Sequence, residues 1–68
     1  MLLTKESIKY YYQNIIKPEK KTSLTLPGIG HHKLVLNEIA SKLNYYHEGK
    51  LIYELSVFDI SGNYELFD

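Results

Sequence analysis

The segment Leu26–His32, with the sequence LPGIGHH, holds the residues of this chain best suited to chemistry. Gly28 and Gly30 allow tight backbone turns, and the free N–H groups at the start of a following helix can bind an anion. Lys33 adds a positive charge beside them, and Lys42 adds a second charge further along. These four residues are the candidate anion- or nucleic-acid-binding site. The simpler interpretation is a turn that needs glycine only for its backbone angles.

The three histidines, His31, His32 and His47, are the candidate metal ligands. On a helix, neighbouring side chains point about 100° apart, so His31 and His32 diverge. His47 follows His32 by fifteen residues, which corresponds to roughly 22 Å along a helix. We therefore expect no metal site and no bound cofactor.

The remaining residues do not form a catalytic pattern. The chain has no cysteine, which excludes a thiol nucleophile, a disulfide framework and a zinc–thiolate site. No serine lies in a nucleophile-elbow sequence, and no glycine-rich segment matches a nucleotide-binding fingerprint. We expect a protein that is not an enzyme.

Length and charge narrow the class of protein further. Sixty-eight residues predict a single domain over 1–68, and no apolar run is long enough to span a membrane, so we expect a cytoplasmic protein without a membrane partner. All eight basic residues are lysines, so the chain has no guanidinium group for bidentate binding of guanine or phosphate. Residues 1–46 carry a net charge of +4 and residues 47–68 a net charge of −4.

The hydrophobic pattern predicts an α+β domain in which two helices pack on a small, mainly antiparallel sheet. The predicted elements are a helix over 4–17, a short strand over 22–26, a helix over 31–48 and a β-hairpin over 50–67. Thr4 can cap the first helix and Pro18 ends it. The apolar stripe of that helix consists of Ile8, Tyr11, Tyr12, Ile15 and Ile16.

The second helix and the hairpin rest on weaker patterns. A stripe at helical spacing supports the helix over 31–48, and Gly49 is placed as its left-handed cap. Its members are His32, Leu36, Ile39, Ala40, Leu43 and His47. Alternation in KLIYELSVFD and in YELF supports the hairpin, with its turn at Ser61 and Gly62. That turn places Val57 opposite Leu66 and Phe58 opposite Glu65.

Two short segments resemble DNA-binding motifs. LPGIG is similar to the hairpin of helix-hairpin-helix proteins, whose Pro-Gly-apolar-Gly turn presents backbone amides to a DNA phosphate. LNEIASKLNYY, residues 36–46, resembles the first helix of a helix-turn-helix, and the element order is similar to that of a winged helix. The resemblances imply a small nucleic-acid-binding protein or transcriptional regulator. The chain departs from them at Asn37, where the first motif has an apolar residue, and in its acidic hairpin.

Apolar residues outside the predicted core indicate a contact surface for another protein. The expected contact residues are Ile52, Glu54, Phe58, Glu65 and Phe67 on the outer face of the hairpin, with Tyr10 and Leu34 on the helices. Our first hypothesis is a small non-enzymatic protein-binding module, such as a phage or mobile-element regulator or inhibitor of a host protein. A second copy of the chain is an alternative partner, and nucleic-acid binding is the alternative function.

Overall fold

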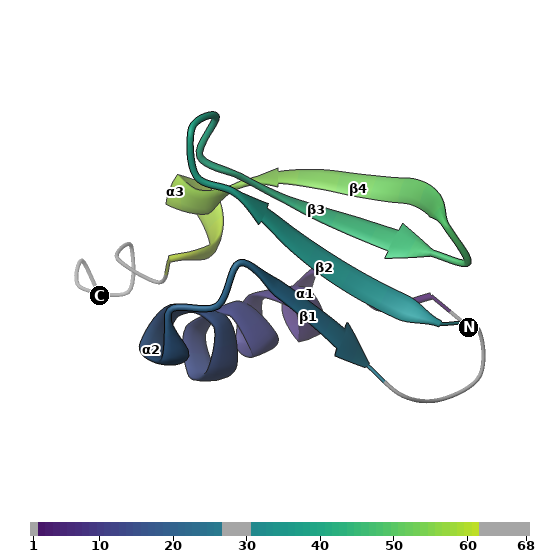
Figure 1. The fold of residues 1–68 in the computed structure, drawn as a ribbon, viewed down its shortest axis with the longest axis horizontal. Helices are drawn as coiled ribbons and strands as arrows, with labels where there is room; N and C mark the ends of the chain where they lie inside the picture. The colour runs from purple at the N-terminus through teal and green to yellow at the C-terminus, as the bar shows by residue number, and fades with distance from the viewer. Residues whose placement is uncertain (1, 27–30, 62–68) are drawn as a thin grey trace.

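The computed structural model describes residues 2–26 and 31–61, which form one long helix, a four-stranded antiparallel sheet and a short final helix (Figure 1). The long helix is continuous over residues 5–19 and consists of α1 (Lys5–Tyr11), η1 (Tyr12–Ile16) and α2 (Lys17–Glu19). The strands are β1 (Ser23–Leu26), β2 (His32–Asn37), β3 (Lys42–His47) and β4 (Lys50–Ser56), followed by the helix α3 (Val57–Ile60). The strands lie side by side in chain order.

The first helix begins at Lys5, one residue after the predicted start, and ends at Glu19, two residues after the predicted end. Thr4 caps it, since its hydroxyl accepts a hydrogen bond of 3.1 Å from the Ser7 N–H. Pro18 does not end the helix, because the preceding turn is wound as a π-helix over Tyr12–Ile16. This wider turn shifts the backbone hydrogen bonds just before Pro18. The proline itself has no N–H group to donate. The helix then ends at Lys20, which adopts left-handed backbone angles.

The predicted strand over 22–26 is present as β1, one residue shorter. Its β-branched and leucine residues alternate, and it pairs antiparallel with β2, so that Leu24 lies opposite Leu34. The connection between these strands, residues 27–30, includes Gly28 and Gly30 and lies outside the described residues.

The predicted helix over 31–48 is wrong, because these residues form the antiparallel strands β2 and β3. The chain reverses over residues 38–41, where the Asn37 side-chain oxygen accepts a hydrogen bond of 3.2 Å from the Ala40 N–H and Ser41 takes a φ of 56°. A turn that is closed by such a side-chain hydrogen bond needs neither glycine nor proline. The residue spacing that fits one helix therefore also fits two strands joined by a four-residue turn.

Gly49 lies in a β-turn and not at a helix end. Glu48 and Gly49 connect β3 to β4, with φ values of 53° and 80°. Two consecutive residues with positive φ are typical of the tight type I′ turn, whose twist matches that of the flanking strands. The predicted glycine conformation is thus correct, but the element that it ends is a strand.

Of the predicted hairpin over 50–67, the first strand is present as β4 and ends at Ser56. The chain leaves the sheet after Ser56, and Val57 and Phe58 belong to α3, so they do not pair as predicted. The second predicted strand, with Glu65 and Phe67, lies outside the described residues. A bulge near Leu51 interrupts the pairing of β3 with β4. This bulge leaves the Leu51 side chain 49% exposed and turns Ile52 partly into the core.

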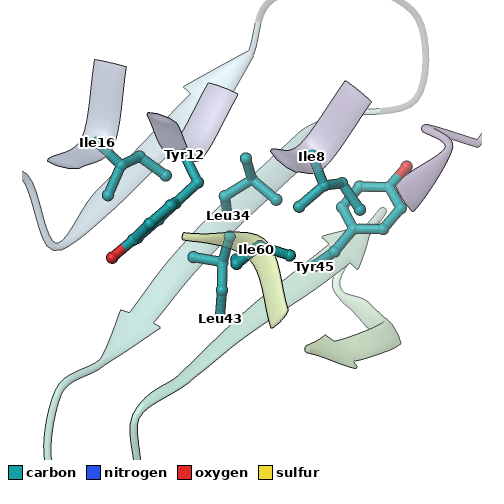
Figure 2. Packing of buried hydrophobic residues seen from close by; sticks show 7 residues of the cluster. All are labelled: Ile8, Tyr12, Ile16, Leu34, Leu43, Tyr45 and Ile60. Atoms are coloured by element: carbon teal, nitrogen blue, oxygen red, sulfur yellow. The ribbon is translucent and has the colours of Figure 1, made fainter. Parts of the chain in front are cut away.

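The core lies between the long helix and one face of the sheet (Figure 2). Its buried members are Ile8, Tyr12 and Ile16 from the helix, Leu34, Leu43 and Tyr45 from the sheet, and Ile60 from α3. The three helical residues are spaced by four, as the predicted stripe requires. Strand alternation places the side chains of Lys33, Val35 and Tyr46 on the opposite face.

The opposite face, called the open face below, is covered by neither the long helix nor α3. It consists of Ser23, Thr25, Lys33, Val35, Asn37, Lys42, Asn44, Tyr46, Leu51, Glu54 and Ser56. Among the residues described, no helix has the length and hydropathy needed to cross a membrane.

Candidate functional site

Four aromatic rings from three strands form a continuous ladder on the core face of the sheet. In order, the aromatic ladder consists of His47, His32, Tyr45 and Tyr53. The ring centroids are 4.8 Å apart for the two histidines, 5.8 Å apart for His32 and Tyr45, and 6.1 Å apart for the two tyrosines. The Lys5 ammonium group lies 5.5 Å from the centroid of the Tyr53 ring. The ladder therefore connects the start of the helix to strands β2, β3 and β4.

The hydroxyl group of Tyr45 links this ladder to the segment before the helix. Its oxygen accepts a hydrogen bond of 3.0 Å from the Leu3 N–H and lies 2.7 Å from Nδ1 of His32. The hydroxyl proton needs an acceptor, and Nδ1 is the one within reach. We therefore assign the proton of the neutral imidazole to Nε2.

The same surroundings favour the neutral form of His32. Burial lowers the pKa of the His32 imidazole below its ordinary value, because it withdraws water from the charged form. The neighbouring His47 ring lowers the pKa further. A proton on Nδ1 would also remove the acceptor that the Tyr45 hydroxyl uses.

The contacts of the Tyr45 hydroxyl indicate that this cluster stabilises the fold. The Tyr45 side chain is completely buried, so a reactant has no access to its hydroxyl. No group of three or more histidine or acidic side chains among the described residues could hold a metal ion. The 22 Å separation expected between His32 and His47 is nevertheless wrong, because the hairpin brings the two rings into contact.

The pKa of His32 predicts a specific dependence of stability on pH. Its folded-state pKa is lower than that of the unfolded chain, so the unfolded chain binds the proton more tightly. The stabilisation is complete above the ordinary value of 6.5 and is lost as the pH falls toward the folded value. We expect the free energy of unfolding to decrease from about pH 7.5 to about pH 5.5, above the range in which most carboxylates titrate.

His32→Gln, which keeps an acceptor for Tyr45, should make this decrease smaller, and urea unfolding at each pH measures it. His31→Gln is the matched control, because it removes an exposed histidine that is adjacent to His32 in the sequence. An equal decrease in wild type and His32→Gln would show that His32 is not responsible.

Leu34 does not belong to a contact surface, which corrects the sequence-based prediction. Its side chain is completely buried in the centre of β2, because this segment is a strand and its core face alternates with a period of two. Ile52 is half-buried and packs against the core at the bulge in β4. Glu54 and Tyr10 are exposed, as predicted, on β4 and α1 respectively.

The two most exposed large apolar side chains among the described residues lie on segments that a hydrogen bond joins. Phe58, on α3, is 75% exposed, and Ile39, in the turn between β2 and β3, is fully exposed. A hydrogen bond of 2.9 Å from the Val57 N–H to the Ser41 carbonyl joins the start of α3 to that turn. Figure 1 shows α3 beside the turn. We call Ile39 and Phe58 the apolar tip.

Several contacts hold α3, and therefore Phe58, in place. The Ser56 hydroxyl accepts a hydrogen bond of 3.2 Å from the Phe58 N–H and caps the helix. The Gln13 side chain donates a hydrogen bond of 3.1 Å to the Ile60 carbonyl, and the Ile60 side chain is buried in the core. The Phe58 side chain is thus exposed on a short helix that is anchored at both ends.

The other predicted site residues are dispersed. Gly28, Gly30, Glu65 and Phe67 lie outside the described residues. Lys33 and Lys42 both lie on the open face, at opposite ends of the pair formed by β2 and β3. No helix begins at residue 31, so the expected anion site at a helix start has no such helix to support it.

Sequence reasoning missed Ile39 and the histidine pair for the same reason. Helical spacing assigns Ile39 to the core and separates His32 from His47. The hairpin instead exposes Ile39 and brings the two histidine rings into contact. The available signal was the alternation of His32, Leu34 and Leu36, followed by that of Leu43, Tyr45 and His47, on either side of Asn37.

Comparisons with known proteins do not assign a function. No protein-family model, curated protein or solved structure matches the chain. A function for this protein must therefore come from its own residues, contacts and charges.

Proposed function

We propose that this chain is a small, non-enzymatic protein-binding module that regulates or inhibits another protein through the apolar tip. The observation that carries the proposal is the exposure of Phe58 on an anchored helix beside the fully exposed Ile39. Single exposed apolar residues are common on protein surfaces, but two large ones on segments joined by a hydrogen bond indicate a contact patch. Aromatic residues of this kind are typical anchors of protein interfaces.

Anchoring favours binding by Phe58. A helix whose backbone is already ordered loses less conformational entropy when a partner covers its exposed side chain. The cap from Ser56, the hydrogen bond from Gln13 and the buried Ile60 fix the backbone of α3 before any partner arrives. Phe58 can therefore enter an apolar pocket without prior ordering of the helix.

The charges beside the tip define the partner. Glu38 precedes Ile39 in the turn, Asp59 follows Phe58 on α3, and both carboxylates are exposed. Complementary charges across an interface increase the association rate and exclude wrong partners. We expect a partner protein with an apolar pocket that is surrounded by lysine or arginine side chains.

Phe58→Glu should abolish binding and leave the fold intact, because the side chain is largely exposed. The test compares wild type, Phe58→Glu and the matched control Tyr10→Glu, which changes an exposed aromatic residue on α1. A partner that wild type and Tyr10→Glu retain from a lysate is purified, and its affinity for each variant is measured. We expect Phe58→Glu to weaken it at least about 30-fold, as at a binding hot spot.

Three outcomes would contradict the proposal. One is an equal affinity of Phe58→Glu and wild type for the purified partner. Another is a loss that Tyr10→Glu shares. The third is a concentration-dependent dimer in sedimentation equilibrium that Phe58→Glu dissociates, because the tip would then bind a second copy of the chain.

A further inference from the structure

We propose that a depression on the open face is a binding site for a nucleotide, either free or within a single-stranded nucleic acid. The depression has a volume of about 460 Å³ and is lined by Thr25, His31, Lys33, Val35, Tyr46 and Gly49. This volume lies within the range of about 300–1,000 Å³ that is typical of small-molecule sites. The depression is on the side of the sheet away from the core and from the ladder.

Strand register, and not chance proximity, brings the main lining residues together. Thr25 lies opposite Lys33 on the neighbouring strand, and Lys33 lies opposite Tyr46. Residues directly opposite each other in an antiparallel pair have Cβ atoms about 5 Å apart on the same face. A hydroxyl, an ammonium group and an aromatic ring therefore form one row across β1, β2 and β3.

The charges of the depression favour an anionic ligand. Its described lining contains the Lys33 ammonium group and the His31 imidazole but no carboxylate. Lys33 is exposed, and so is His31, which takes a left-handed backbone conformation with a φ of 49°. Phosphate oxygens accept hydrogen bonds from both side-chain types.

The Tyr46 ring favours a planar aromatic group beside that anion. Tyr46 is half-buried on the open face and takes part in none of the ring pairs found among the described residues. Val35 supplies an apolar neighbour within the same depression. Bases stack on aromatic side chains of exposed sheets in single-strand-binding proteins, and this stacking tolerates any base. A ring next to a lysine thus matches a base next to its phosphate.

The open face continues beyond the depression in a way that suits a longer strand. Asn44 follows on β3, and its side-chain oxygen is buried without a hydrogen-bond partner in the described structure. Lys42 lies at the far end of the same strand. We expect a second phosphate of such a strand to contact Lys42, whereas the buried Asn44 oxygen is not accessible to a base. Glu54 lies opposite Asn44 and should weaken the binding of a polyanion.

The test titrates thymidine monophosphate and a short fluorescent oligothymidylate into the full chain. We expect Tyr46→Ala to weaken binding by roughly 5- to 150-fold, the equivalent of about 1–3 kcal/mol per stacked base. Lys33→Gln should weaken binding and lower the slope of log affinity against log salt by about 0.7, the value for one phosphate contact with a single strand. Tyr46→Phe should bind as wild type does, and Glu54→Gln should bind the oligonucleotide more tightly.

Tyr10→Ala is the matched control, because it removes an exposed tyrosine from α1, on the other side of the sheet. Binding of the mononucleotide with this pattern of variants identifies a free nucleotide as the ligand, and binding of the oligonucleotide alone identifies a single strand. Lys33→Gln provides a test that does not depend on the folding of Tyr46→Ala, since Lys33 is exposed.

The proposal is overturned if neither probe binds at millimolar concentration. It is also overturned if both Tyr46→Ala and Lys33→Gln bind as wild type does, or if the depression binds an acidic peptide in place of both probes. Phe58→Glu should not change nucleotide binding, so this site and the apolar tip can fail independently of each other.

Discussion

We expect Leu34→Ala to lower the free energy of unfolding by about 3 kcal/mol, a large part of the stability of a small domain. Leu34 is completely buried in the centre of the sheet, with Leu24 and Tyr45 opposite it on the two neighbouring strands. The shortened side chain leaves a cavity between strands that cannot collapse without losing their pairing. Urea unfolding followed by circular dichroism measures the change.

Val35→Ala is the matched control for Leu34. Val35 is the next residue of β2, but its side chain lies on the open face and is only half-buried. We expect this substitution to cost about 1 kcal/mol or less. An equal loss in the two variants would contradict the assignment of the core to the helix side of the sheet.

The second large effect is expected for Tyr45→Phe, which should lower the free energy of unfolding by about 1–3 kcal/mol. The substitution removes one oxygen and leaves the ring of the ladder in place. The Leu3 N–H then loses its acceptor, and Nδ1 of His32 loses the hydroxyl that it faces. Leaving a buried polar group without a partner lowers the free energy of unfolding by more than the net contribution of the hydrogen bond that was lost.

Tyr46→Phe separates this effect from a general loss of tyrosine hydroxyls. Tyr46 is adjacent in sequence, but it lies on the open face, and we expect a change within about 0.5 kcal/mol. A double-mutant cycle of Tyr45→Phe with His32→Ala should show an interaction energy of at least about 0.5 kcal/mol, since the two side chains contact each other. Additive effects, or an equal loss in Tyr46→Phe, would contradict the proposed role of this hydroxyl.

Local sequence is sufficient for the elements whose signals do not depend on distant residues. The cap at Thr4 and the four-residue spacing of Ile8, Tyr12 and Ile16 predict the first helix and its buried face. The alternation that precedes Pro27 predicts β1 in the same way. The π-helical turn before Pro18 was not predicted. Its wider winding changes the backbone hydrogen bonds that the proline would otherwise break.

The exposure of the residues in the proposed contact surface could be predicted only in part. Phe58 was identified as exposed, and it is, but the element that presents it is α3 and not a strand. Its neighbour in the apolar tip, Ile39, comes from a turn that the sequence pattern places inside a helix. The depression around Tyr46 was not predicted, since it depends on the register of three strands.

The sequence by itself determined the α+β composition, the first helix with its buried stripe, and the positive φ of Gly49. The tertiary structure alone decided that residues 32–47 form two strands. The spacing of their apolar residues fits both one helix and a pair of strands joined by a turn after Asn37. The neighbours that these side chains contact in the folded chain decide between the two. Pairing with β1 and β4 on either side provides the backbone hydrogen bonds and the buried contacts of Leu34 and Tyr45. A local pattern cannot include these interactions, because their partners lie elsewhere in the chain.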